Sequence, residues 1–278
     1  MSQTIQTLLQ TASTSLMPAS ETPRLDAELL LTHVLKKTRT YLHTWIEEKI
    51  IASDVENFFS LIRERQQGKP LAYLTGHKAF WSLDFSVTEA TLIPRPETEL
   101  LVELILHHVV GEKKQLADLG TGCGAIALSL AFEKPDWQIY ATDKSRAALS
   151  VAQLNAERFA LNNVIFREGD WCQALPKMLF DVVVSNPPYL ASSDEHLRAL
   201  SYEPHSALVA KDGGLADIQC IIAGAKAFLK SNGHLMIEHG CTQGEVVRRL
   251  FAGHQYEQVE TIQDLAGLER VTVGRAMV

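Results

Sequence analysis

The chain has 278 residues, of which 46% are hydrophobic and 21% charged, a composition typical of a globular protein with one large and one smaller domain. A formal net charge of −7 argues against a protein that holds nucleic acid mainly by neutralising phosphates. The cysteines lie far apart without a C-x-x-C pair, so reduced, mostly buried thiols are expected in place of a zinc site or a disulfide framework.

The amino-terminal stretch MSQTIQTLLQTASTSL lacks the basic segment and the long apolar run of a signal peptide. No window of the chain approaches the ~18 apolar residues of a membrane span. We therefore expect a cytoplasmic protein.

Residues 1–75 carry apolar side chains at helical spacing, as at Leu25 and Leu29. The pattern S-x-x-E at Ser53 and Glu56 predicts a capping box at the start of a helix. This segment is expected to form a small helical domain.

In residues 76–92 the period changes to two. Trp81, Leu83, Phe85 and Val87 alternate with polar side chains, a pattern typical of a strand or of one arm of a hairpin. We expect a β-hairpin here that links the helical domain to the rest of the chain.

Residues 93–278 begin with an amphipathic helix opened by Pro96 and Glu97, after which strands and helices alternate. The predicted strands are Gln115–Leu119, Gln138–Thr142, Val164–Glu168, Phe180–Ser185 and His234–Glu238. This alternation predicts an α/β fold, a Rossmann-like parallel sheet covered by helices on both faces. The stretch EQVETIQDLAGLERVTVGRA adds two β-like runs, which predict a closing antiparallel pair at the sheet edge.

A glycine-rich stretch, LADLGTGCGAIALSLA, joins the first of these strands to a helix. Glycines at such a junction let the backbone approach a ligand closely. Asp143 ends the following strand, at the position used by a carboxylate that accepts both hydroxyls of a ribose. These features predict an adenosine-containing cofactor held by Asp118, Gly120, Thr121, Gly122, Cys123, Gly124 and Asp143.

The spacing G-x-G-x-G, with Asp118 two positions before the first glycine, resembles the S-adenosylmethionine loop of class I methyltransferases. Nicotinamide enzymes use G-x-G-x-x-G, so hydride transfer is the alternative chemistry. A tight turn that binds nothing is the structural alternative.

Asp170 and Trp171 follow the third predicted strand. An aromatic face at this place can stack on adenine while a polar neighbour reads its exocyclic amine. The alternative places Trp171 in the core, because large aromatic side chains are usually buried.

The fourth predicted strand ends in Asn186-Pro187-Pro188-Tyr189. Prolines lock φ near about −65° and remove two N–H donors, so a rigid corner is expected where open α/β sheets bind ligands. The side-chain oxygen of Asn186 and the carbonyl of Pro187 can each accept one N–H of an incoming NH₂ group, and Tyr189 supplies a flat wall. We expect Asn186, Pro187 and Tyr189 to be catalytic and all four residues to bind substrate; the alternative is a Pro-Pro turn with Asn186 as a cap.

This chemistry requires no general base, because a methylated amide becomes acidic and passes its proton to a carbonyl or to water. We therefore predict neither a catalytic histidine nor a metal. His107, His108, His234 and His239 are expected at the surface or in packing.

Motifs along the chain resemble the HemK/PrmC family of protein-(glutamine) methyltransferases. They are RLDAELLL, PLAYLTG, IPRPETE, DLGTGCG, NPPY, YEP, EHG and DLAGLERV, and they cover nearly the whole chain. The resemblance implies a class I methyltransferase domain that uses S-adenosyl-L-methionine, preceded by a helical domain that docks the substrate protein. It implies methyl transfer to the side-chain amide of the glutamine in the Gly-Gly-Gln motif of class-1 peptide chain release factors.

The resemblance also implies site residues. It places Gly120 to Gly124, Asp143, Trp171 and Asn186 at the cofactor, and Asn186 to Tyr189 around the substrate glutamine. Arg95, Glu97 and Thr98 are similar to the segment that precedes the loop in this family, near the cofactor. In the family, glycine-rich sequence usually follows AL, and the stretch ALVAKDGG departs from that pattern. The departure affects only the conformation expected for this loop.

A DNA adenine methyltransferase is an alternative, because it presents a flipped exocyclic amine to the same tetrapeptide. The residues after Tyr189 leave no room for a separate DNA-reading domain, so no direct nucleic-acid partner is expected, and no membrane partner either. A ribosomal-protein glutamine methyltransferase is a nearer alternative, although IPRPETE and the short helical domain favour the release-factor enzyme. A noncatalytic binding module would need a damaged loop or tetrapeptide, and both are intact.

Overall fold

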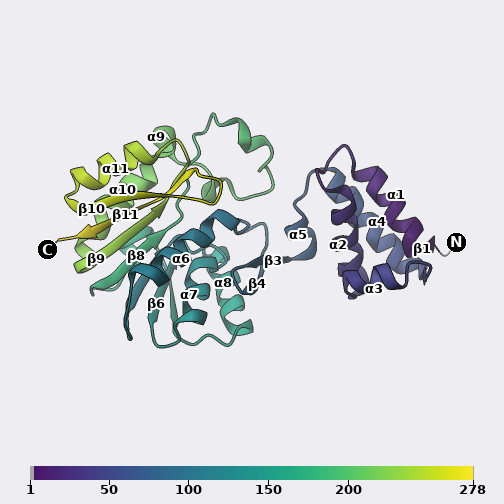
Figure 1. Ribbon diagram of the computed structural model, residues 1–278, viewed down its shortest axis with the longest axis horizontal. Coiled ribbons are helices and arrows are strands. Elements are labelled where there is room, and N and C mark those ends of the chain that lie inside the picture. Colours follow the sequence, from purple (N-terminus) through teal and green to yellow (C-terminus); the bar gives the residue numbers. More distant parts are fainter. Residues whose placement is uncertain (1–2, 278) are drawn as a thin grey trace. The chain divides into compact units, whose positions relative to one another are not determined.

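The computed structural model of the chain describes residues 3–277 (Figure 1). The chain divides into two compact units, Met1–His77 and Lys78–Val278, and each has its own hydrophobic core. None of the helices within residues 3–277 is both long and apolar enough to pass through a bilayer.

The first unit is helical, as its periodicity predicts. Its elements are β1 (Gln3–Thr4), α1 (Ile5–Leu16), α2 (Pro23–Leu35), α3 (Arg39–Thr44), β2 (Lys49–Ile50), α4 (Ala52–Gln66) and α5 (Leu71–Thr75). Side chains at helical spacing, among them Leu8, Leu9, Leu30, Leu31 and Phe58, form its core and are fully buried.

The predicted capping box at Ser53 is wrong. Helix α4 begins at Ala52, and Ile51, an extended residue that follows β2 directly, occupies the N-cap position without a side-chain hydrogen bond. Ser53 therefore lies inside the first turn, where its hydroxyl cannot cap the helix.

Two buried acids on α2 tie the helices of this unit together. Asp26 accepts a hydrogen bond from Nε of Arg65 on α4 at 2.8 Å, and Glu28 accepts hydrogen bonds from Arg24 and Arg39. Burial raises the pKa of Glu28, but the two arginines outweigh it and hold that pKa below its ordinary value. The RLDAELLL segment thus contributes ion pairs as well as leucines.

A hairpin of β3 (His77–Phe80) and β4 (Leu83–Ser86) follows. Trp81, expected in a strand, lies in the turn with φ 55°. Its backbone N–H donates to Oε1 of Glu99 at 2.7 Å, and its indole N–H donates to Oε1 of Glu133 at 2.7 Å. These two bonds hold a conformation that a bulky residue rarely adopts.

The second unit is a mostly parallel sheet with helices, as the alternating pattern predicts. Its strands are β5 (Gln115–Leu119), β6 (Gln138–Asp143), β7 (Val164–Glu168), β8 (Phe180–Ser185), β9 (Leu229–Glu238), β10 (Tyr256–Gln263) and β11 (Glu269–Ala276). The strand order is β10-β11-β9-β8-β5-β6-β7, and β10 and β11 are antiparallel. The predicted closing pair at the sheet edge is therefore confirmed.

Helices cover the sheet in Figure 1. They are η1 (Pro96–Thr98), α6 (Glu99–His108), α7 (Ala125–Glu133), α8 (Arg146–Arg158), η2 (Trp171–Ala174), η3 (Glu195–Arg198), η4 (His205–Ala207), α9 (Lys211–Gly214), α10 (Ala216–Ala225), η5 (Lys226–Phe228) and α11 (Gly244–Gly253). Ile221 of α10 and Phe251 of α11 pack with Val183 and Leu235 of the central strands in one buried cluster. Helix α7 contacts β5 and β6, and α8 contacts β6 and β7.

The chain reverses its strand order at β5, which pairs with β6 on one side and β8 on the other, both in parallel. Parallel strands end at the same sheet edge, so the segments that follow β5, β6 and β8 meet there. The glycine-rich stretch, Asp143 and the Asn186 tetrapeptide occupy these positions. The topology thus gathers residues that are far apart in sequence.

Candidate active site

Two cavities adjoin at Asn186. The first has a volume of about 240 Å³, and its lining includes Gly120, Gly122, Asp143, Lys144, Gly169, Asp170, Trp171, Asn186 and Pro188. The second has a volume of about 180 Å³, and its lining includes Arg95, Asn186, Pro187, Tyr189, Leu190, His196, Leu200 and Leu208. The two cavities share Asn186, Leu92 and Ala207 in their linings, so they lie next to each other at these residues.

Backbone hydrogen bonds shape the glycine loop after β5. The N–H groups of Gly120 and Thr121 donate to the carbonyl of Thr142 at 2.9 and 2.8 Å, which binds the loop to β6. Gly120 has φ 75°, and a Cβ there would lie 3.1 Å from the ring of Trp171. Glycine thus allows both the turn and the close approach of the indole.

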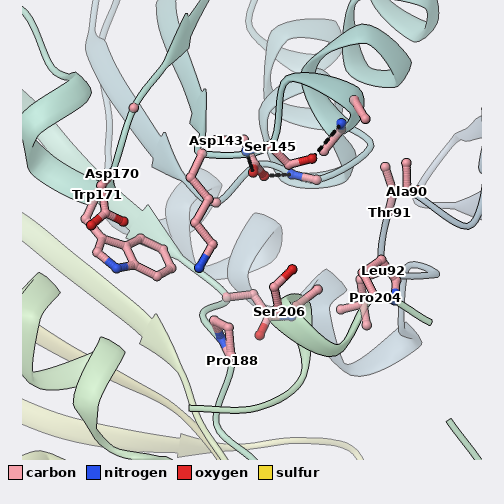
Figure 2. A pocket seen from close by; sticks show the side chains of 18 residues that line it. Ala90, Thr91, Leu92, Asp143, Ser145, Asp170, Trp171, Pro188, Pro204 and Ser206 are labelled. Atoms are coloured by element: carbon pink, nitrogen blue, oxygen red, sulfur yellow. Dashed lines mark hydrogen bonds between the residues drawn. The ribbon is translucent and has the colours of Figure 1, made fainter. Parts of the chain in front are cut away.

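Asp143 is fixed by two backbone donors. Its Oδ2 accepts from Gly122 N at 3.0 Å, and its Oδ1 accepts from Ser145 N at 2.8 Å. Figure 2 shows this carboxylate among the side chains that line the first cavity. Each carboxylate oxygen has a further lone pair, so Asp143 can still accept from hydroxyl groups of a ligand.

Asp170 and Trp171 lie side by side on the wall of the first cavity, and Thr91 and Leu92 lie on another side of it (Figure 2). The half-buried indole also packs against the core, and its Nε1 donates to Oδ1 of Asp217 on α10 at 3.2 Å. Trp171 therefore both contacts the core and lines the cavity, and its stacking on adenine stays a prediction.

Four residues predicted to hold the cofactor do not line either cavity: Asp118, Thr121, Cys123 and Gly124. Asp118 is fully buried, and its Oδ2 accepts from the Thr121 hydroxyl at 2.6 Å. Burial raises the pKa of Asp118 to about 7, although the bond from Thr121 lowers it in part. Asp118 and Thr121 thus stabilise the loop through a buried hydrogen bond between their side chains.

The tetrapeptide after β8 contributes to both cavities. Asn186 lines both, Pro188 lines the first, and Pro187 and Tyr189 line the second. The Nδ2 group of Asn186 donates to Oγ1 of Thr98 at 3.1 Å. The side-chain oxygen of Asn186 is therefore the part of its amide left to face a ligand.

Support for Tyr189 comes from the loop after β9. Nε2 of Gln243 donates to the Tyr189 carbonyl at 3.0 Å, and Oε1 of Gln243 accepts from Gly240 N at 2.9 Å. A Cβ at Gly214, which has φ 90°, would lie only 2.1 Å from the same carbonyl. Gly214, the last residue of ALVAKDGG, therefore lies directly against the tetrapeptide.

Sequence reasoning missed part of the lining. The backbone segments at 90–92 and 204–207 line the first cavity, and Glu203 ties them together. Its carboxylate accepts from Ile93 N at 3.0 Å and forms an ion pair with Arg95. The signal in the sequence was the glutamate of YEP. In the structure this side chain is only 7% exposed, but neither its burial nor its distant partners could be read from spacing.

Within residues 3–277 no group of three or more histidine, cysteine or acidic side chains is arranged to hold a metal ion. His196 lines the second cavity, and burial lowers the pKa of His234 to about 4. The cysteines are free; Cys123 and Cys172 are buried but Cys220 and Cys241 are exposed, so the expectation of mostly buried thiols is only half right.

Comparisons with known proteins show the family of each unit and the fold that the second unit shares with solved structures. Residues 7–76 match the PrmC N-terminal domain, and residues 96–260 match the Methyltransferase small domain. Solved structures share the fold: a methyltransferase from Pyrococcus furiosus has a TM-score of 0.55 at 18% identity and covers 80% of this chain and all of its own. A 16S ribosomal RNA methyltransferase from T. thermophilus has a TM-score of 0.53 at 19% identity over 72% of this chain and 49% of its own.

Sequence relatives extend over nearly the whole chain. Release factor glutamine methyltransferases from Coxiella burnetii and Escherichia coli are 46% and 45% identical to it, covering 95% and 94% of this chain and 95% of each relative. The enzyme of that name from Aliivibrio fischeri is 43% identical and covers 100% of this chain and 99% of its own. The chain therefore belongs to the family of release factor glutamine methyltransferases.

Proposed function

We propose that the chain transfers a methyl group from S-adenosyl-L-methionine to the side-chain amide nitrogen of the glutamine in the Gly-Gly-Gln motif of a class-1 peptide chain release factor. One observation carries the proposal: two cavities meet at Asn186, whose Nδ2 is already bound to Thr98. The free oxygen of Asn186 suits an NH₂ group, which has two protons to donate.

The first cavity fits the cofactor. The carboxylate of Asp143, held by two N–H groups, would accept the ribose hydroxyls. The Trp171 ring offers a stacking surface for adenine, and Asp170 beside it offers an acceptor for the adenine amine. Gly120 and Gly122 expose backbone at the cavity, and the buried residues Asp118, Thr121, Cys123 and Gly124 would contribute through the shape of the loop.

The second cavity fits the substrate glutamine. The Asn186 oxygen and the Pro187 carbonyl would each accept one N–H, while Tyr189 and leucine side chains exclude water around the amide. The bound cofactor supplies a methyl group on a positively charged sulfur. Asn186 and Pro187 would hold the amide nitrogen in line with that methyl group, so that the nitrogen could accept it. The methylated nitrogen then loses its proton to a carbonyl or water, so no side chain need act as a strong base.

The partner is inferred from the family. The relatives named above carry the release factor in their names and match this chain from the helical unit to the last strands. We propose that the helical unit docks the release factor and that the reaction takes place in the cytoplasm, where translation ends. Ribosomal proteins and DNA remain the alternative substrates that the experiment must include.

A methyl-transfer assay tests the proposal. The protein is incubated with methyl-labelled S-adenosylmethionine and a class-1 release factor, and the labelled peptide is identified by mass spectrometry. We expect one label on the glutamine of Gly-Gly-Gln and none on a factor with alanine at that position. Label on ribosomal proteins alone, or N6-methyladenine in an oligonucleotide, would contradict the proposed substrate.

A further inference from the structure

Glu238 is a buried acid at the end of β9, next to the end of β8. The pairing of Ser185 with Ile237 brings it level with Asn186, the next residue of the neighbouring parallel strand. Glu238 is 1% exposed and lines neither cavity. The mechanism described above gives this carboxylate no role, so its burial calls for an explanation.

The side chains around Glu238 form a short network. Asn186 Nδ2 donates to Oγ1 of Thr98 at 3.1 Å, and hydrogen bonding from the Thr98 and Asn186 side chains lowers the pKa of the Glu238 carboxyl, against the larger effect of burial. The remaining oxygen, Oε2, is buried without a hydrogen-bond partner in the described part of the chain. A buried acid with one unpaired oxygen costs stability, so the fold alone does not account for it.

An ionised carboxylate can only accept hydrogen bonds, which sets the direction of this network. Thr98 must donate its single proton to Glu238 and therefore accepts from Asn186. If the amide of Asn186 rotated by half a turn, its oxygen would face the lone pairs of Thr98 and the charge of Glu238. That arrangement is repulsive, so the oxygen stays on the side of the cavities.

We infer that Glu238, with Thr98, is a positioning residue that fixes the amide of Asn186 with its oxygen toward the reacting nitrogen. The inference rests on the proposed function, in which that oxygen accepts an N–H of the substrate. Without the network, half of the amide orientations would present an NH₂ group to another NH₂ group, and neither could accept. The acid therefore acts through Asn186.

The network should respond to pH. Burial raises the pKa of Glu238 to about 7, with the Thr98 bond and the charge of Arg270 on β11 opposing this and the charge of Glu97 on η1 adding to it. Burial, with the charge of Glu238 adding to it, raises the pKa of Tyr189 to about 12, so Tyr189 stays neutral. Once protonated, Glu238 can donate and no longer imposes one orientation. The turnover number should therefore fall as the pH drops through about 7.

The test combines Thr98→Val, Glu238→Ala and Glu238→Gln with Asn186→Ala. Turnover and KM are measured with the release factor, and cofactor affinity is measured by calorimetry. Thr98→Val and Glu238→Ala should lower turnover by roughly 10- to 100-fold, less than the 10²–10³ typical of a lost direct contact, and leave cofactor affinity within about twofold. In the Asn186→Ala background neither should cause a further loss.

Two variants serve as controls. Glu238→Gln can donate as well as accept, as protonated Glu238 can, so its turnover should match that of the parent enzyme at low pH and show no pH dependence near 7. Thr272→Val removes another buried hydroxyl on the neighbouring strand β11, where it binds His239 at 2.9 Å. It should leave turnover within about twofold of the parent enzyme.

Equal losses in the parent and Asn186→Ala backgrounds would overturn the inference, because Glu238 and Thr98 would then act independently of Asn186. If Glu238→Gln left the pH profile unchanged, the proposed direction of the hydrogen bonds from Asn186 through Thr98 to Glu238 would be overturned. If Glu238→Ala fails to fold, the Thr98→Val and Glu238→Gln variants test the inference without it. A parent enzyme that labels no release factor would contradict the proposed function and this inference with it, whereas independent losses in an active enzyme contradict the inference alone.

Discussion

At the residue scale, Asn186 carries most of the proposed chemistry. Asn186→Ala removes the acceptor for the substrate N–H but leaves Asp143 and Trp171 in place at the first cavity. We expect turnover to fall by ~10²–10³ and cofactor affinity to change little, because the lost contact acts mainly in the transition state. Single-turnover kinetics and calorimetry measure the two effects separately, and normal turnover would exclude a role for Asn186 in the reaction.

Asp143 provides a second residue-scale prediction. Asp143→Ala should weaken cofactor binding by roughly 10- to 150-fold, since hydrogen bonds to a charged acceptor contribute about 1.5–3 kcal/mol. Asp143→Asn keeps one oxygen able to accept from Gly122 or Ser145 and should lose less. Titration calorimetry reports both affinities, and equal affinity in parent and Asp143→Ala would refute contact with the ribose.

Asp118 predicts a dependence of stability on pH. Its folded-state pKa of about 7 lies above the ordinary value of 3.8, because burial disfavours the charge. Between about pH 4 and 7 the folded protein keeps a proton that the unfolded chain loses, so stability falls as pH rises. At about 1.4 kcal/mol per pH unit, the cost above pH 7 is roughly 4 kcal/mol.

Asp118→Asn should remove that dependence. The neutral side chain is expected to raise the free energy of unfolding at about pH 8 and to have little effect near pH 4, where the parent acid is protonated in both states. Denaturant unfolding at the two pH values measures the difference. A variant that is destabilised equally at both pH values would show that the charge of Asp118 is not the source of the pH dependence.

At the element scale, α2 and α4 are held together by Asp26, which accepts from Ser20, Thr22 and Arg65. Asp26→Ala leaves these donors unpaired and should destabilise the helical unit by roughly 1–3 kcal/mol. Hydrogen exchange should accelerate in α2 and α4. Glu64→Ala, which breaks the more exposed pair with Lys69, is the matched control and should cost less than about 1 kcal/mol.

Elements with a clear period were predictable from sequence, and those set by distant contacts were not. Three of the predicted strands, Gln115–Leu119, Val164–Glu168 and Phe180–Ser185, have the observed bounds because continuous or alternating apolar runs end at polar or turn residues. Trp81 has an apolar side chain in an alternating run, yet bonds to Glu99 and Glu133 place it in a turn. Nothing local signals those partners.

The same division holds for the candidate site. The glycine loop and the tetrapeptide were predictable because glycine and proline carry their backbone preferences in the sequence. The links from Glu203 to Arg95 and from Asn186 to Thr98 join residues about a hundred positions apart, so only the folded sheet reveals them. For Asp118 and Cys123 the motif indicated the loop but not that their side chains point away from the cavity.

At the scale of the whole molecule, the separate cores of the two units predict separable tasks. Deletion of residues 1–77 should leave cofactor affinity within about threefold, because both cavities belong to the second unit. It should abolish methylation of an intact release factor while preserving the slow methylation of a short Gly-Gly-Gln peptide. Undiminished activity of the truncated enzyme on the intact factor would show that the helical unit is not a docking domain.

The position of β11 between β9 and β10 has a consequence for synthesis on the ribosome. The helical unit has all its residues early in the chain and can fold as soon as they leave the exit tunnel. The sheet cannot be completed until Ala276 has emerged, because β11 forms the hydrogen bonds on one side of β9, the strand that ends in Glu238. Between the synthesis of Glu238 and that of Ala276, nascent chains therefore have one folded unit and an unpaired edge on β9, which exposes them to chaperones and to mispairing.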